Sequence, residues 1–366
     1  MKKLLGITTA LVGLTALAAS AQASDPVKLE LGGYSYWYVG YADNNVKGSS
    51  YQPVDVKGDN EIWFTGSSTL DNGVKVSAHI EMEAGGHTDQ RTDIIDQSYV
   101  TAEAGFGKIL IGTAHNAAST LHVSAPDVGL GLSDGDYGLW VASTLTHEFF
   151  TTFADRDDNA EKIGYYSPSF HGLSFAASYT PTVGSEDNRG TTALTSASAH
   201  DAVALALGYT REFADWTVAA SAGYYRHSIK GYDATQEFTM GLKIGYGAWM
   251  LGGSFRHSEE DDRVNNLTGT GTGAYSTAGD GIAYDVALSY TSGPMAVSLG
   301  YMASDAYGTT TGGADQQMHL IQLSGAYELG AGVSAVGSIF YNEYDGGTKA
   351  TQNDGVGVVS GLRLTF

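Results

Sequence analysis

The sequence predicts an all-β fold, namely a transmembrane antiparallel up-and-down β-barrel of about 16 strands with short periplasmic turns and long outside loops. Three observations predict this fold. Segments of about ten residues alternate apolar side chains with small or polar ones, and the connections between them alternate between short and long. After residue 23 no apolar run approaches the roughly 20 residues that a membrane-spanning helix needs.

The alternation has a period of two, which is the period of a strand and not of a helix. In one segment Phe238, Met240, Leu242, Ile244 and Tyr246 share one face, and Glu237, Thr239, Gly241, Lys243 and Gly245 share the other. The same pattern along the chain predicts strands at 27–41, 58–70, 74–84, 93–104, 108–115, 160–167, 173–181, 200–212, 216–228, 234–246, 248–258, 281–291, 295–305, 316–328, 333–343 and 355–366.

The connections between these strands carry topological information. Some are tight turns, such as Asp71-Asn72-Gly73, Gly105-Phe106-Gly107 and Ser292-Gly293-Pro294. Between them lie long polar connections, at 42–57, 116–159, 182–199 and 259–280. Because short and long connections alternate, an up-and-down barrel would have all its turns at one end and all its loops at the other, and its strand count would be even.

A soluble β-sandwich, barrel or solenoid is the alternative fold class. Its inward face would be filled by large apolar side chains. In this sequence the second face instead mixes Lys, Glu, Ser, Gly and Thr along nearly every strand. A closed sheet with apolar residues outside and polar residues inside requires lipid around it and water within it, and closure leaves no unpaired sheet edge. We therefore expect a membrane barrel.

The first residues have the features of an export signal. Met1, Lys2 and Lys3 give a positive start, an apolar stretch follows, and Ala21-Gln22-Ala23 is a small-x-small cleavage site. We expect residues 1–23 to be a signal peptide and residues 24–366 to form a single β-barrel pore domain. The absence of cysteine excludes disulfides and thiolate sites.

The chain is strongly acidic, with 40 Asp and Glu residues against 19 Lys and Arg residues and a formal net charge of -21. This balance argues against nucleic acid as a partner, because phosphates need a basic surface. It suits either a protein that handles cations or a protein with a solvated acidic surface.

Two hairpins and the final strand resemble a known family. Residues 98–112 (SYVTAEAGFGKILIG) and 162–175 (KIGYYSPSFHGLSF) resemble the hairpins that flank the inward-folded loop of Gram-negative general porins of the alphaproteobacterial type, and the sequence ends on Phe366 in a strand. The resemblance implies a sixteen-stranded trimeric barrel of the outer membrane whose third loop, at 116–159, folds into the pore. It also implies that Phe366 is an insertion signal. Thr113 and Ala114 stand where the family has an arginine.

The long segment 116–159 is acidic, and we expect some of its acids to lie at the constriction of the pore. These candidates are Asp127, Asp134, Asp136, Glu148 and Asp155. Within Ser133-Asp134-Gly135-Asp136-Tyr137-Gly138 two carboxylates are two residues apart, so Asp134 and Asp136 could bind calcium, or they could belong to a solvated turn. No other cofactor is expected.

The alternation also predicts charged side chains on the lumen wall. The expected lumen-facing bases are Lys75, His79, Arg226, Lys243 and Arg363, and the expected lumen acids are Glu81 and Glu237. Acids on the loop opposite bases on the wall would set up a field across the pore, or the bases would simply be held by neighbouring acids. The overall excess of acid predicts a weak preference for cations.

Aromatic residues crowd the first strand, where Tyr34, Tyr36, Trp37, Tyr38 and Tyr41 occur together. We interpret them as part of an aromatic girdle at the membrane interface. A sugar-binding aromatic track in the lumen is the alternative, and Trp63 is its best candidate.

These observations predict an outer-membrane pore for passive diffusion of small hydrophilic solutes and ions. A substrate-selective channel for sugars or anions would have the same fold. A barrel enzyme is disfavoured because no histidine accompanies a nucleophile motif such as G-x-S-x-G. The expected partners are outer-membrane lipid, further copies of the chain in a homotrimer, the barrel-insertion machinery and small polar solutes.

Overall fold

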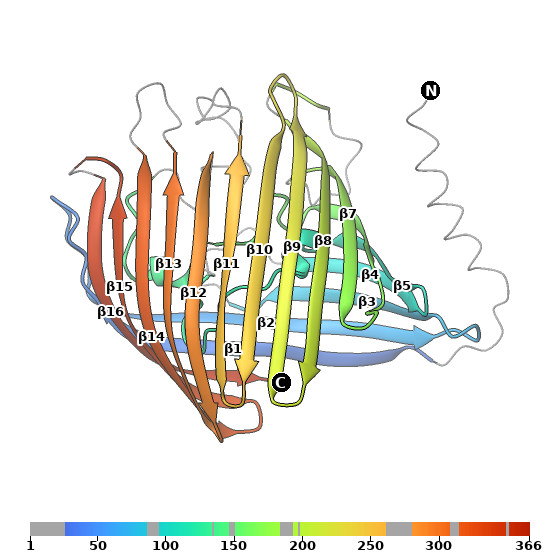
Figure 1. The fold of residues 1–366 in the computed structure, drawn as a ribbon, viewed down its shortest axis with the longest axis horizontal. Helices are drawn as coiled ribbons and strands as arrows, with labels where there is room; N and C mark the ends of the chain where they lie inside the picture. Colours follow the sequence, from blue (N-terminus) through green and yellow to red (C-terminus); the bar gives the residue numbers. More distant parts are fainter. Residues whose placement is uncertain are drawn as a thin grey trace.

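The computed structural model describes residues 26–85, 95–133, 135–145, 151–183, 193–196, 198–260, 280–307, 315–348 and 351–366. Sixteen antiparallel strands form one closed barrel (Figure 1), which confirms the predicted fold class. The strands are β1 Lys28–Ala42, β2 Val54–Thr69, β3 Lys75–Glu83, β4 Ile95–Ala104, β5 Gly107–Thr113, β6 Glu161–Tyr166, β7 Leu173–Thr182, β8 Ala199–Phe213, β9 Trp216–Ile229, β10 Thr235–Tyr246, β11 Trp249–Glu259, β12 Gly281–Ser292, β13 Met295–Ala306, β14 Gln316–Gly330, β15 Val333–Asp345 and β16 Gln352–Thr365.

Each strand pairs with its neighbours in the sequence, and β1 closes the barrel against β16. The closure reaches the last residue, because the backbones of Gly33 and Phe366 exchange two hydrogen bonds of 3.0 Å each. The side chain of Phe366 is 59% exposed and continues the outward row of Leu362 and Leu364. The terminal aromatic residue therefore belongs to the apolar outer surface.

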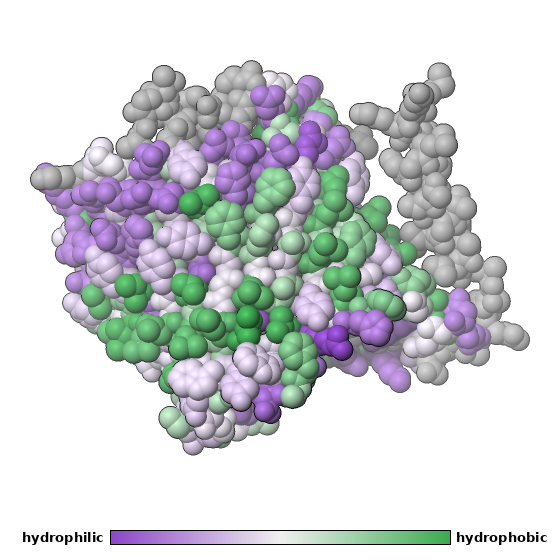
Figure 2. All heavy atoms as spheres, in the orientation of Figure 1, coloured by the Kyte–Doolittle hydropathy of each residue, from purple (hydrophilic) through white to green (hydrophobic). Residues whose placement is uncertain are grey.

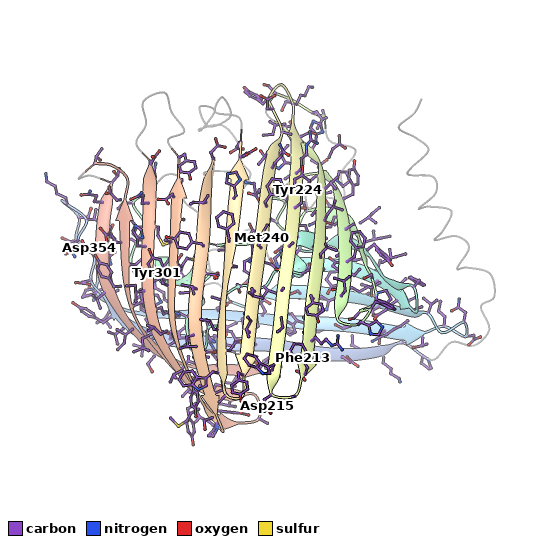
Figure 3. The ribbon with its side chains drawn as sticks, in the orientation of Figure 1. Phe213, Asp215, Tyr224, Met240, Tyr301 and Asp354 are labelled. Carbon is purple, nitrogen blue, oxygen red and sulfur yellow. The ribbon has the colours of Figure 1, made fainter. Side chains whose placement is uncertain are left out.

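Short turns lie at one end of the barrel and longer connections at the other (Figure 1). The turns at Gly73 and Gly293 place these residues at φ values of 80° and 55°, a left-handed conformation that glycine adopts without steric cost. Figure 3 shows Phe213 and Asp215 at the end of the barrel that carries the turns. Both tight turns and long loops thus occur where the alternating connection lengths predicted them.

The outer surface is apolar around the middle of the barrel. Figure 2 shows a band of hydrophobic side chains across the visible face, with hydrophilic ones gathered toward the loop end. Met240 is 62% exposed and Leu251 is 55% exposed, and Figure 3 shows Met240 on the outer surface of β10. Such exposure of large apolar groups is favourable in contact with lipid or with another apolar protein surface. Among the described residues no helix has the length and apolarity needed to cross a bilayer.

The interior holds a folded segment that we call the inner loop, the described residues of 114–160 between β5 and β6. Its described helices are α2 Ala117–Thr120 and the single 3₁₀ turn η2 Asp136–Leu139. The inner loop packs against the barrel wall in two apolar clusters. One joins Tyr137, Trp140 and Val141 to wall residues such as Met302 and Phe340, and the other joins Ala117 and Ala118 to wall residues such as Ala176 and Tyr225.

Candidate functional site: the pore constriction

The inner loop leaves the wall at Asn116, whose side chain forms four hydrogen bonds within the loop. Its Oδ1 accepts hydrogen bonds from the backbone N–H groups of Ala118 and Ser119, at 2.8 and 3.0 Å. Its Nδ2 donates to the carboxylate of Asp157 at 2.6 Å and to the carbonyl of Ala154 at 2.7 Å. Asn116 therefore caps α2 and also joins the outgoing limb of the inner loop to its returning limb.

Serine side chains on the wall fix the path of the inner loop across the lumen. Each accepts a hydrogen bond from a loop backbone N–H, and the serines come from four different strands. The pairs are Ala117 with Ser178 at 3.0 Å, Val123 with Ser221 at 2.9 Å, Val128 with Ser298 at 3.3 Å and Leu130 with Ser338 at 3.1 Å. Because buried backbone groups need partners, these serines allow irregular backbone to lie inside the barrel.

Two carboxylates organise the tip of the inner loop. Asp127, a predicted constriction acid, accepts hydrogen bonds from the backbone N–H groups of Val128 and Leu132 at 2.8 and 3.1 Å. It also accepts hydrogen bonds from Ser298 at 2.9 Å and Gln322 at 3.2 Å on the wall. The carboxylate of Asp127 thus stabilises the conformation of the loop tip and also places a negative charge at the lumen.

The second carboxylate, Asp285 on β12, was not identified as a site residue from the sequence. It is 3% exposed and accepts hydrogen bonds from the backbone of Ala125 at 3.0 Å and the hydroxyls of Ser133 at 2.5 Å and Ser254 at 2.7 Å. Thr152 on the returning limb donates a further hydrogen bond at 3.2 Å. Asp285 therefore holds both limbs of the inner loop to the wall.

The returning limb is held by ion pairs around the buried Glu237. Arg156 and Arg256 both contact Glu237 at 2.6 Å, and Glu237 has no exposed side-chain surface. Asp155 lies 3.8 Å from Arg256. Glu237 and Asp155, predicted as a lumen acid and a constriction acid, thus share Arg256 as a partner, and sequence reasoning missed both Arg256 and Arg156.

A cavity of about 420 Å³, which we call the aperture, lies between the tip of the inner loop and the wall. Its charged lining residues are Asp59, Asp127, Asp136, Lys243 and Arg363. The Nε of Arg363 donates a hydrogen bond of 2.7 Å to the hydroxyl of Tyr38, and another guanidinium nitrogen donates to the carbonyl of Gly129 on the loop. The aperture therefore brings together loop acids and wall bases that were predicted separately.

The wall formed by β1 and β2 presents an aromatic row beside an acidic row. Tyr34 pairs with Glu61 across the two strands, and Tyr36 pairs with Asp59. The hydroxyl of Tyr34 donates to the two carboxylate oxygens of Asp59 at 3.2 and 3.3 Å. Asp59 and Glu61 fall within the predicted second strand, 58–70, but were not named as lumen acids, and β2 begins earlier, at Val54, which adds Asp55 to the acidic row.

The girdle interpretation is wrong for three residues of β1. Trp37 and Tyr41 are 46% and 49% exposed on the outer surface, whereas Tyr34, Tyr36 and Tyr38 alternate with them and face the lumen. The reason is that consecutive aromatic residues in a strand must point to opposite faces, so one cluster in the sequence becomes two surfaces. Trp63 also faces the lumen, where its ring lies 6.0 Å from that of Tyr34.

The prediction that Arg226 faces the lumen is wrong. Arg226 pairs with Val203 on β8 and with Gln236 on β10, and directly paired residues lie on the same face of a sheet. Val203 is 39% exposed on the outer surface, and Arg226 is exposed there as well, near the loop end of β9. Residues 219–223 (AASAG) are small on both faces, so the alternation within β9 did not determine which side faces the pore.

The remaining predicted wall residues lie on β3. His79 accepts or donates a hydrogen bond of 2.9 Å with Thr65, lies 3.5 Å from Glu81 and stacks on Tyr99. Lys75 is exposed near the turn end and pairs with Glu103. Asp134 and Glu148 lie outside the described residues, so the Asp134–Asp136 pair is not described as a cation site.

Three carboxylates on the same side of the lumen provide a set of oxygen donors. The ligand oxygens of Glu61, Glu81 and Asp96 lie within 4.8 Å of one another. Trp63 donates a hydrogen bond of 2.9 Å to Glu61, and Asn159 donates one of 2.8 Å to Asp96. Oxygen ligands of this kind are those that hard divalent cations such as calcium take.

Comparisons with known proteins agree with this architecture. The family model described as Gram-negative porin matches residues 8–347, whereas no curated protein matches the sequence. Among solved structures, the anion-selective porin from Comamonas acidovorans has a TM-score of 0.64 at 18% identity, over 93% of this chain and 100% of that one. The trimer form of OmpT from Vibrio cholerae has a TM-score of 0.58 at 13% identity, over 93% and 100%. OmpF of Salmonella typhi in complex with daunomycin has a TM-score of 0.61 at 15% identity, over 93% and 98%.

The structural matches establish the shared barrel fold, and the family model covers nearly all of the described strands. A closed barrel with an apolar outer surface and a polar, loop-narrowed interior is what a diffusion pore requires. The chain belongs to the Gram-negative porin family and is a diffusion channel of the outer membrane.

Proposed function

We propose that this channel passes small hydrophilic solutes and ions without a fixed substrate, with a weak preference for cations. The composition of the aperture supports this proposal, because Asp59, Asp127 and Asp136 line it together with Lys243 and Arg363. Charges of both signs around one narrow opening favour polar and dipolar solutes over apolar ones. The additional acid favours cations, because carboxylates at a constriction raise the local cation concentration.

The preference is weak because the wall bases remain at the opening. Arg363 is held against Tyr38 and the loop carbonyl of Gly129, so its charge stays beside the path of the solute. The acidic row of β2, with Asp55, Asp59 and Glu61, lies on the lumen side next to this opening. An anion is therefore attracted by the wall bases and repelled by the carboxylates. A cation is repelled by the bases but attracted by the more numerous carboxylates.

Planar-bilayer conductance tests the proposal. In KCl the conductance should rise without saturation as the salt concentration increases, and a KCl gradient should give a reversal potential on the cation side. A reversal potential on the anion side would contradict the cation preference. Saturation by one sugar would indicate a substrate-selective channel, and hydrolysis of lipid or peptide without conductance would indicate an enzyme.

We further propose that the channel works without a cofactor, as a homotrimer exported through cleavage after Ala23. The similarity to a porin solved in trimer form supports the assembly. Mass determination of the outer-membrane protein in mild detergent, before and after heating, tests the trimer. The N-terminal sequence of the same sample tests the cleavage site, with Ser24 as the expected first residue.

A further inference from the structure

We propose that the lumen contains a binding subsite for small organic cations of the quaternary-ammonium class. The subsite is a cavity of about 440 Å³, which we call the side chamber, between the β1–β2 wall and the inner-loop residues Leu130, Asp136, Leu139 and Trp140. The proposal rests on the diffusion function above and adds a solute class to it. A volume of this size accommodates a small organic molecule.

The charge of the side chamber selects for cations. Its lining includes five carboxylates, which belong to Asp55, Asp59, Glu61, Glu83 and Asp136. Among the lining residues that the structure describes, Lys57 is the one base, and its ammonium group lies 2.6 Å from Asp55. A monovalent cation that enters the side chamber therefore remains in a field of excess negative charge.

The aromatic lining indicates that the cation is organic. Tyr34, Tyr38 and Trp140 line the same side chamber, and the leucine side chains at 130 and 139 add apolar surface. Quaternary ammonium groups are recognised by aromatic faces together with negative charge, because the ring quadrupole attracts a cation that carries apolar methyl groups. A hydrated metal ion would gain little from the rings, since it is bound mainly by oxygen atoms.

The protein's own cations show that two of these rings, those of Trp140 and Tyr38, accept positive charge. The ammonium group of Lys57 lies 5.2 Å from the centre of the Trp140 ring. The guanidinium group of Arg363 lies 5.7 Å from the ring centre of Tyr38 and 5.0 Å from that of Tyr36, which lines the neighbouring aperture. Lys57 thus occupies one face of the side chamber as a tethered ammonium group, and an organic cation in solution would compete with it.

Trp140 has a defined position in the side chamber. It is 6% exposed, and a Cβ atom added at Gly40 on β1 would lie 2.7 Å from its ring. The ring therefore packs directly on the backbone of the wall and is prevented from turning away. The side chamber shares Asp59 and Asp136 with the aperture, so a cation bound there lies on the path of permeating ions.

Choline and its neutral isostere 3,3-dimethyl-1-butanol provide a direct test. The potassium current through the purified channel is measured in planar bilayers at low KCl concentration while each compound is added. We expect choline to reduce the current along a saturating curve, and we expect the isostere at equal concentration to have no effect. Equal effects of the two compounds, or an effect of choline that never saturates, would overturn the proposal.

Variants locate the site. Tyr34→Leu and Glu61→Gln should each raise the half-saturating choline concentration about three- to tenfold, which is the range of a lost cation–π or charge contact. Lys57→Met should lower it, because the substitution removes the competing ammonium group. Tyr41→Leu, on the outer surface of the same strand, is the matched control and should leave it unchanged. Unaltered choline affinity in all three site variants would overturn the assignment.

The same recordings separate the two proposals. A normal KCl conductance without saturable choline block would remove the organic-cation subsite and leave the diffusion function intact. A folded, inserted channel without KCl conductance would contradict both. Circular dichroism and the unheated oligomer band verify that each variant has folded.

Discussion

The carboxylate of Asp285 on β12 accepts a hydrogen bond of 3.0 Å from the backbone N–H of Ala125 on the inner loop. The same carboxylate accepts hydrogen bonds from Ser133 on the outgoing limb and Thr152 on the returning limb. Because a charged acceptor strengthens each hydrogen bond, one buried wall residue contributes more to the loop position than any single serine. The width of the pore therefore depends on a residue outside the loop.

Replacing Asp285 with alanine should loosen the inner loop. Each hydrogen bond to a charged group contributes roughly 1.5–3 kcal/mol, and about 1.4 kcal/mol changes an equilibrium tenfold. We expect the population with a detached loop to rise at least tenfold, seen as larger and noisier single-channel conductance. Ser289→Ala on the same face of β12 is the control. Unchanged conductance and noise in Asp285→Ala would contradict the anchoring role.

Lys162→Met should destabilise the barrel where the inner loop rejoins β6. Lys162 is 2% exposed, and its ammonium group donates to the carbonyls of Asp158 and Ala160 at 2.8 and 2.7 Å and lies 3.8 Å from Asp157. Removing one partner of a buried ion pair costs about 3–5 kcal/mol. Thermal unfolding in detergent should show a clearly lower unfolding temperature for Lys162→Met. The control Lys75→Met, at an exposed lysine, should unfold at the same temperature as the wild type.

Asp59→Asn should shift selectivity toward anions. Asp59 lines both the aperture and the side chamber, so its charge acts in both cavities. One unit charge at about 4 Å in water is worth about 1 kcal/mol, which bounds the change in local potassium concentration at about fivefold. The reversal potential in a KCl gradient measures it. Asp71→Asn, in an exposed turn, is the control, and an equal shift in both variants would argue against a local effect.

The fold could be predicted almost completely from the sequence. All sixteen predicted strands are present, since lipid imposes alternation and short turns impose register. The second strand is longer than predicted. Its acidic row begins at Asp55, between Val54 and Val56, but a boundary set at residue 58 hid this alternation.

The candidate site could be predicted less well, because it depends on contacts between distant segments. Asp285 follows the alternation of its strand, but nothing local indicates that it meets residues 125, 133 and 152 of the inner loop. The partnership of Arg156 and Glu237 likewise joins residues 81 positions apart. The predicted orientation of Arg226 was wrong for a local reason. Its neighbours are small on both faces of the strand and do not show which face is apolar, so only the pairing with β8 and β10 determines the orientation.

Acid should loosen the inner loop through His122. Burial lowers the pKa of His122 to about 4, helped by the positive charges of Arg256 and Lys243 and opposed by Asp285. Its Nε2 lies 3.1 Å from the hydroxyl of Thr152, and its ring packs on Phe153. The ordinary pKa of histidine is about 6.5, so a released loop binds the proton more readily than a docked one. Docking is therefore fully favoured above about pH 6.5 and weakens progressively as the pH falls to about 4.

A difference of about 2.5 pKa units corresponds to a loss on the order of 3 kcal/mol at the acid end of this window. The measurement is single-channel noise and conductance between pH 7 and pH 4 for the wild type and for His122→Asn, which keeps a polar group near Thr152 but does not titrate. Burial also raises the pKa of Asp157, so both proteins will respond to acid through that carboxyl. The wild type should respond more strongly between pH 6.5 and pH 4. Identical pH profiles would show that His122 does not couple protonation to loop docking.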